Sequence, residues 1–239
     1  MKIPFRTINY SIDPSIVGVK GGMGNSYLSD DFFKKNVGYS SIFLRRESKW
    51  WNTWSNWQLY GSDLVEVDLE KRGRLTDFIK PGKLLRGFFV NNKLRNILEK
   101  SILPNHHFFE VTFNQSGKII DGYWWFCFDY ETGEQNIDFS KCEYDLSFHL
   151  RNINKDFNPI INTYSDYINI VSETDAAIKT TKLVFNSNFN SDIDIFGTQF
   201  LTNDIYISEK LYHNLREQNV TGYRVEYPIV EMEFNYPVH

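Results

Sequence analysis

The sequence predicts an α+β fold that consists mostly of antiparallel or mixed sheet with a few short amphipathic helices. Three observations indicate this class: short segments rich in aromatic and β-branched residues are frequent, helical segments are few, and the two kinds do not alternate regularly along the chain. With 239 residues, 41% of them hydrophobic and 17% aromatic, the chain can bury a sizeable core. The high aromatic content excludes a disordered protein.

Five segments have the pattern of β-strands. They are bounded by turn-forming residues and comprise residues 39–45, 64–67, 84–90, 108–113 and 123–128. Residues 109–113 alternate between apolar and polar, which indicates a strand with one buried face. Residues 123–128 are apolar throughout, which predicts a strand that is covered on both faces.

The first predicted helix covers residues 92–101. Leu94, Ile97 and Leu98 recur at the spacing of one helical face. Asn91 stands directly before this segment and is a favourable N-cap residue, because its side-chain oxygen can accept a hydrogen bond from an unpaired amide of the first turn.

Two further helices are expected. One follows Ser208, which is a favourable N-cap, and it has Leu211 and Leu215 on its buried side. The other is a shorter segment at residues 173–180. Strands therefore outnumber helices, in agreement with the α+β class.

The two capped helices belong to a probable internal strand-helix-strand repeat with a constant offset of 117 residues. Residues 89–94 (FVNNKL) match residues 206–211 (YISEKL), and the same offset pairs Leu98 with Leu215. Duplication of one supersecondary unit would explain this match, and the alternative is a coincidence of a common β-turn-α-β pattern. A repeat of this kind is packing architecture and indicates no chemistry by itself.

The charges are distributed unevenly along the chain. The 26 basic and 30 acidic residues give a net charge of −4, but residues 1–100 carry +7 and residues 101–239 carry −11. Much of the acid lies at residues 129–145. The two parts can balance each other within the molecule, or the acidic part can present a face to a basic partner.

The sequence suggests an N-terminal strand-rich lobe at residues 1–80 and an α+β domain at residues 81–239, without a low-complexity linker between them. No run of apolar residues is long enough for a membrane span, and the N-terminus lacks the apolar core of a secretory signal. Cys127 and Cys142 are too few for a disulfide framework. A cytoplasmic location is therefore expected.

The sequence contains no recognised catalytic signature: no Gly-x-Gly-x-x-Gly, no Walker loop, no His-Glu-x-x-His and no Gly-x-Ser-x-Gly. Cys127 and Cys142 lack the paired spacing of zinc ligands, and Cys127 is expected in the core. His106 and His107 are neighbours and would point to opposite faces of a strand, so they cannot chelate one ion. No catalytic residue, metal site or cofactor is predicted.

Four of the six tryptophans lie close together, at Trp50, Trp51, Trp54 and Trp57. They can pin a loop onto the core, or they can form an interaction patch, because tryptophan is enriched in binding hot spots. Basic residues on both sides of the cluster would also suit a single-stranded nucleic acid, but the acidic second part of the chain opposes that interpretation. No nucleic-acid partner is expected.

Four segments resemble a known family. They are residues 123–126 (YWWF), 137–144 (IDFSKCEY), 205–211 (IYISEKL) and 220–223 (VTGY). They look like the immunity proteins of bacterial polymorphic toxin systems of the Bacteroidetes type, which share an aromatic strand, an Ile-Asp-Phe-x-x-Ser-x-Phe-like stretch and a C-terminal strand-Ser-helix-Gly-aromatic unit. Cys142 stands where serine is more usual and Tyr144 replaces phenylalanine. The resemblance covers about the last 150 residues.

The resemblance implies a cytoplasmic, non-enzymatic protein that binds and neutralises a cognate toxin, and no catalytic residue carries over. A nuclease toxin would have a basic groove, which an acidic patch with Glu131, Glu134 and Asp138 would fit. These residues and the four tryptophans are the candidate partner-binding residues, without a nucleic-acid or membrane partner and with the oligomeric state left open. The alternatives are an interaction or structural module with another partner, and an unrecognised hydrolase.

Overall fold

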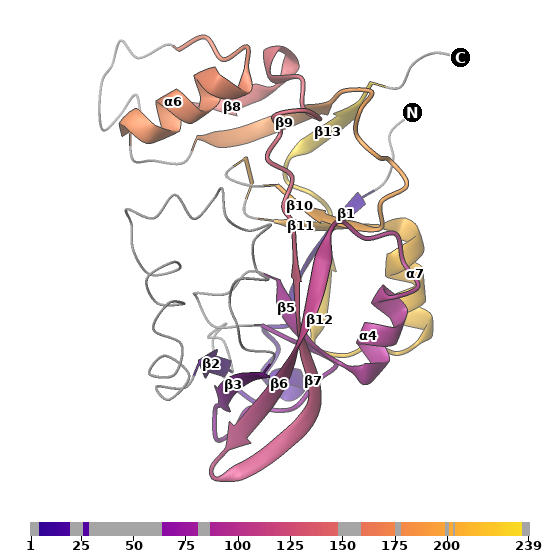
Figure 1. The fold of residues 1–239 in the computed structure, drawn as a ribbon. Helices are drawn as coiled ribbons and strands as arrows, with labels where there is room; N and C mark the ends of the chain where they lie inside the picture. Colours follow the sequence, from indigo (N-terminus) through magenta and orange to yellow (C-terminus); the bar gives the residue numbers. More distant parts are fainter. Residues whose placement is uncertain are drawn as a thin grey trace. The chain divides into compact units, whose positions relative to one another are not determined.

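The computed structural model describes residues 5–19, 26–28, 64–80, 87–147, 159–174, 178–198, 201–202 and 204–235. These residues form an α+β fold of antiparallel and mixed sheets with short helices, as the sequence predicted (Figure 1). The tryptophan cluster and the strand expected at residues 39–45 lie outside the described residues.

The chain forms two compact units, and each is assembled from several segments. Unit 1 comprises residues 1–7, 130–209 and 226–239, and unit 2 comprises residues 8–129 and 210–225. Each unit therefore combines chain segments that are far apart in the sequence.

Unit 2 contains a six-stranded sheet with the order β2-β3-β6-β7-β5-β4. Its strands are β2 (Ser26–Leu28), β3 (Leu64–Leu69), β4 (Phe78–Ile79), β5 (Phe88–Asn91), β6 (His106–Gln115) and β7 (Lys118–Phe128). Only β3 and β6 are parallel, and β6 and β7 form a long hairpin (Figure 1). The short helix α1 (Pro14–Val17) also belongs to this unit.

Residues 123–128, the second half of β7, are covered on both faces, which confirms the prediction from their apolar sequence. Tyr123, Trp125 and Cys127 belong to the core cluster on one face. Phe126 and Phe128 alternate with them, are at most 1% exposed and stack on each other at 5.0 Å. The helix α4 (Asn92–Leu98) packs against β5 and β7.

Unit 1 contains a three-stranded sheet of order β13-β9-β8, in which β9 is parallel to β13 and antiparallel to β8. Its elements are the 3₁₀ turn η3 (Phe139–Lys141), β8 (Glu143–Asp145), α6 (Tyr164–Thr174), β9 (Lys179–Phe185) and β13 (Glu231–Phe234). The core is rich in aromatic rings, and the stacked pair Phe185 and Phe234 lies near its centre with a centroid distance of 5.0 Å.

A four-stranded sheet of order β10-β11-β1-β12 accompanies these sheets. Its strands are β1 (Phe5–Tyr10), β10 (Ile195–Gly197), β11 (Ile205–Ser208) and β12 (Tyr223–Glu226), and the helix α7 (Glu209–Glu217) connects β11 to β12. Leu211 and Leu215 are buried on α7, as the sequence predicted.

The predicted internal repeat is present and includes one strand more than expected. The elements β4, β5, α4 and β6 begin 117 residues before β10, β11, α7 and β12, respectively. The first two strands of each copy are antiparallel and share one register, since Phe78 faces Val90 and Ile195 faces Ile207. In each sheet another strand, β7 or β1, lies between the second and the last strand of the copy.

One predicted helix is wrong. Residues 179 and 180, expected at the end of a helix, belong to β9, and the helix α6 lies earlier, at Tyr164–Thr174. Tyr167 and Ile170, one turn apart, are buried in the unit 1 core. Tertiary packing of this face stabilises the helix despite its β-branched residues, which have low intrinsic helix propensity.

Candidate functional site

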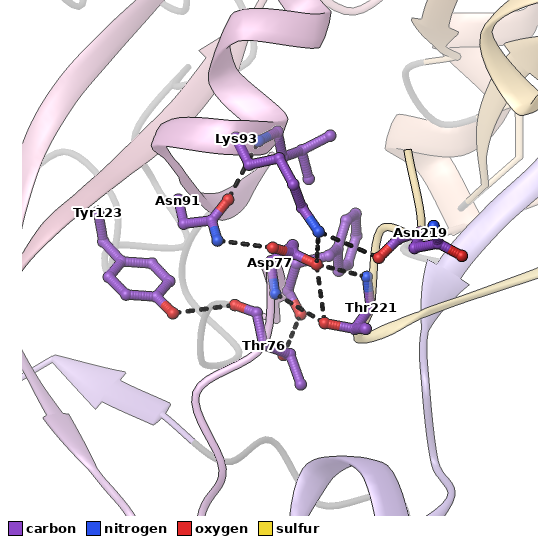
Figure 2. Close-up of polar contacts among 9 residues, drawn as sticks. Thr76, Asp77, Asn91, Lys93, Tyr123, Asn219 and Thr221 are labelled. Atoms are coloured by element: carbon purple, nitrogen blue, oxygen red, sulfur yellow. Dashed lines mark hydrogen bonds and ion pairs between the residues drawn. The ribbon is translucent and has the colours of Figure 1, made fainter. Parts of the chain in front are cut away.

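A buried aspartate, Asp77, joins three chain segments of unit 2 (Figure 2). Its Oδ1 accepts a hydrogen bond of 2.6 Å from Asn91 Nδ2. Its Oδ2 accepts bonds from Thr221 N at 2.6 Å and Thr221 Oγ1 at 2.8 Å, and it lies 2.9 Å from Lys93 Nζ. With a residue exposure of only 7%, the carboxylate exchanges water for a full set of protein donors.

Local sequence explains how these groups meet. The antiparallel pairing of β4 and β5 brings Asn91 N within 3.1 Å of Asp77 O. Asn91 caps α4 by accepting a bond of 3.0 Å from Leu94 N, so its amide group is left to reach Asp77. Lys93 lies in the first turn of α4 and also donates to Asn219 O at 3.0 Å.

The charge of this cluster is stabilised in the fold. Burial alone would raise the pKa of Asp77, but hydrogen bonds from Lys93, Thr221 and Asn91 outweigh it and hold the pKa below its ordinary value. Burial and the charge of Asp77 raise the pKa of Tyr123 to about 12. Such an aspartate is a poor general base, because its oxygens are already occupied by donors and its proton affinity is low.

The second copy of the repeat contains the counterpart of this aspartate. Asp194 is 1% exposed, and its Oδ1 accepts a hydrogen bond of 2.6 Å from Ser208 Oγ. Its carbonyl oxygen accepts a bond of 3.0 Å from Ser208 N. The sequence did not predict this role for either aspartate, although each precedes its helix cap by 14 residues. Their role follows from these contacts: each fixes a strand to the cap of the following helix.

The candidate residues Glu131 and Glu134 have different environments. The Glu131 carboxylate accepts bonds from Gly133 N at 2.8 Å and Asn136 Nδ2 at 2.5 Å, so it shapes the turn that follows it. Glu134 is exposed on the same turn. A charge change at Glu134 therefore probes the surface, whereas one at Glu131 also disturbs the turn.

The third acidic candidate, Asp138, is held within its own turn. Lys141 Nζ lies 2.8 Å from Oδ2, and Ser140 Oγ donates to Oδ1 at 2.6 Å. Hydrogen bonds from Lys141 and Ser140 lower the pKa of Asp138. Lys141 cancels much of the charge that this residue would present to a partner.

The uneven charge along the sequence corresponds to the two units. The residue ranges of unit 1 contain 16 acidic and 7 basic residues, a net charge of −9, and those of unit 2 contain 14 acidic and 19 basic residues, a net charge of +5. Glu131, Glu134 and Asp138 all belong to unit 1. The acidic residues of the second part of the chain therefore fall mainly within the residue ranges of one compact unit.

Unit 2 has an open groove of about 370 Å³ between α7, β12 and α1. Tyr212, Arg216, Tyr223 and Val220 line it together with Ile16. The guanidinium of Arg216 lies 5.8 Å from the ring centroid of Tyr212, within cation-π range. Sequence analysis did not identify this groove, because its residues come from two segments that are distant in the chain.

The cysteines have the environments of structural residues. Cys127 is fully buried in the unit 2 core, as predicted. Burial raises the pKa of Cys142, whose Sγ accepts a bond of 3.4 Å from Val184 N, so the reactive thiolate is disfavoured. The described residues contain no group of three or more His, Cys, Asp or Glu side chains that could hold a metal ion.

The adjacent histidines point to opposite faces of β6, as predicted. The His106 ring contacts Phe108 and Phe126, whereas the His107 ring packs on Phe109, which belongs to the core cluster. His106 Nδ1 lies 2.8 Å from Pro104 O. The two imidazoles cannot converge on one ion or one reacting atom.

The four tryptophans Trp50, Trp51, Trp54 and Trp57 lie outside the described residues, so their role as core or surface groups stays a prediction. In the part of the chain that the structure describes, each helix is too short or too polar to cross a bilayer. No protein-family model matches the chain, and no curated protein does either.

Proposed function

We propose that this chain is a non-enzymatic immunity protein that binds and neutralises a cognate bacterial toxin domain. The observation that carries the proposal is the acidic character of unit 1. The net charge of unit 1 is −9, whereas that of unit 2 is +5. A concentrated charge of one sign on a compact unit speeds association with a partner of the opposite sign and aligns it. A toxin with a basic active-site groove, such as a nuclease, is such a partner.

The resemblance supports the same function. Three of its segments fall on the framework of the two units: residues 123–126 lie in β7, residues 137–144 span η3 and enter β8, and residues 205–211 form β11 and the start of α7. These segments hold the aromatic core and the second helix cap. A family defined by such residues shares a scaffold and can vary its surface for different toxins.

Three perturbed titratable groups are poorly suited to catalysis. Asp77 and Asp138 have lowered pKa values because donors and cations hold them ionised, and Cys142 has a raised pKa because it is buried. A general base needs a pKa near the working pH, and a nucleophilic thiol needs a lowered one. Each of these shifts runs against catalytic use, so we assign these residues to the fold.

Co-expression tests the proposal. The proposal expects a large multidomain toxin to be encoded beside this gene, and the C-terminal domain of such a neighbour is produced from an inducible promoter, with and without this chain. The proposal predicts that the domain alone stops growth, that this chain restores growth, and that the two proteins co-purify. A catalytically inactive variant of the domain serves as the control for co-purification, because it can be produced without killing the host.

Three results would contradict the proposal. Growth arrest that persists although this chain is present in excess would end the immunity function for that pair. Co-purification without rescue would instead support a general interaction module. Rescue without a complex would indicate an enzyme that repairs the damage or destroys a product of the toxin.

A further inference from the structure

The segment between β12 and β13 exposes large apolar side chains on the acidic unit. Tyr227 is 76% exposed and Ile229 is 87% exposed, with Pro228 between them. We call residues 227–229 the apolar tip. Single exposed apolar residues are common on protein surfaces, but an aromatic and an aliphatic side chain this exposed in one tripeptide are concentrated enough to act together.

The apolar tip is held at both ends. Before it, Thr7 Oγ1 donates a hydrogen bond of 3.1 Å to Glu226 O. After it, Val230 is 9% exposed and packs in the unit 1 core, and β13 continues parallel to β9. A short segment between two fixed points loses little conformational entropy when it binds, and Pro228 restricts the backbone further.

The ring of Tyr227 is also positioned before any partner arrives. The Arg6 guanidinium lies 4.9 Å from its centroid, in cation-π geometry. Arg6 is itself fixed by an ion pair with Glu209. The tyrosine therefore has a support within unit 1 that does not depend on a partner, and most of its surface still faces solvent.

Acidic residues stand on both sides of the apolar tip in the sequence. Glu226 directly precedes it and Glu231 follows after Val230, and both are exposed. Glu233 follows and pairs with Lys182 at 2.9 Å. Residues 226–239 contain three glutamates and no lysine or arginine. An apolar centre with a charged rim is the usual composition of a protein interface, and the sign of this rim selects a basic surface.

We infer that the apolar tip inserts into an apolar depression on a basic face of the toxin domain, which the net negative charge of unit 1 attracts. This inference rests on the proposed function and adds the contact element to it. Tyr227 supplies the aromatic anchor, and Ile229 fills the depression. A second copy of this chain is a poorer occupant, because it would place one set of glutamates against another.

The test is an affinity measurement with the inactive toxin domain of the growth assay. The variants Ile229→Asp and Tyr227→Ala are compared with wild type by calorimetry, and Ile160→Asp is the matched control. Ile160 is 77% exposed and also belongs to unit 1, so its substitution has the same polarity change outside the tip. Because all three side chains are exposed, the variants should keep the wild-type melting temperature.

We expect Ile229→Asp and Tyr227→Ala each to weaken binding by about 30-fold or more, as hot-spot residues do, and Ile160→Asp to change it by less than about threefold. Wild-type affinity in both tip variants would overturn the inference while leaving the proposed function in place. A wild-type chain that does not bind the domain would overturn both. Sedimentation of the same variants tests the remaining occupant, a second copy of this chain. If the tip variants lose self-association but bind the toxin domain as wild type does, the apolar tip belongs to a homodimer interface and the inference is overturned.

Discussion

Asp77 and Asp194 are 117 residues apart in the sequence and make equivalent hydrogen bonds in the two copies of the repeat. Each carboxylate accepts a 2.6 Å hydrogen bond from the side chain of the helix-cap residue 14 positions later, Asn91 in one copy and Ser208 in the other. Backbone bonds of 3.1 and 3.0 Å connect the same pairs. Both copies of the repeat therefore contain the same pair of hydrogen bonds between the aspartate and the helix-cap residue, although the cap residue is asparagine in one copy and serine in the other.

Removing the charge of Asp77 should destabilise the protein. In Asp77→Asn an amide nitrogen faces donors from Thr221 and Lys93, and we expect unfolding free energy to fall by about 2 kcal/mol, as for a broken buried hydrogen-bonded pair. Glu99→Gln is the control, because it breaks the more exposed Arg95–Glu99 pair and should cost less than about 0.5 kcal/mol. Urea denaturation measures both. Equal stabilities of the two variants would contradict this role of Asp77.

The contribution of Asp77 should depend on pH in one direction. Its pKa is lower in the folded protein than in the unfolded chain, where about 3.9 is ordinary, so the stabilisation is complete above about pH 5. It is lost as the pH falls below the unfolded value towards the folded one. The stability difference between wild type and Asp77→Asn, measured by urea denaturation from pH 7 to pH 3, should therefore shrink below about pH 4. If the stability difference between wild type and Asp77→Asn instead grows as the pH falls, the pKa of Asp77 is raised in the folded protein and not lowered.

The two helix caps should contribute separately. Asn91→Ala and Ser208→Ala each remove a cap side chain and leave an aspartate without one donor, so each should lower stability by about 1–2 kcal/mol. Because each cap serves its own helix, the double variant should show the sum within about 0.5 kcal/mol. Chemical denaturation of the three variants gives the values. If the loss of unfolding free energy in the double variant differs strongly from the sum of the two single losses, the hydrogen bonds at the two caps depend on each other.

Substitutions of Glu131 and Glu134 in unit 1 should differ in their effect on stability. Glu131→Ala removes the acceptor for Gly133 N and Asn136 Nδ2 and should cost about 1–2 kcal/mol. Glu134→Ala should change stability by less than about 0.5 kcal/mol, because its side chain is exposed. Thermal unfolding distinguishes them. If both variants are equally stable, Glu131 is free to act as a surface residue.

The sequence predicted the elements whose determinants are local. The cap at Asn91, the buried faces of the two helices and the doubly covered segment at residues 123–128 follow from residue type and spacing, and the structure confirms them. Ser208 directly precedes α7, at the predicted N-cap position. The helix at Tyr164–Thr174 was missed because its β-branched residues favour a strand locally, and core packing overrides that preference.

The polar contacts were beyond prediction for a different reason. Thr221 and Asp77 are 144 residues apart, and neither residue type signals a partner at that distance. Glu131 and Asp138 resembled solvated acidic residues, because hydrogen bonds to a nearby amide or a lysine depend on the turn that the chain adopts. The exposure of Tyr227 and Ile229 was also not predicted, because apolar residue types alone do not indicate which side chains face solvent.

Titration calorimetry of this chain with an inactive variant of the toxin domain that the proposal expects to be encoded beside its gene, at about 50 mM and about 500 mM salt, tests the account most directly. We expect a one-to-one complex with submicromolar affinity at low salt, weakened at least about tenfold at high salt, because the acidic unit attracts a basic partner and salt screens that attraction. Absence of binding at about 100 µM would contradict the immunity function. Tight binding that does not respond to salt would contradict the role of the acidic unit.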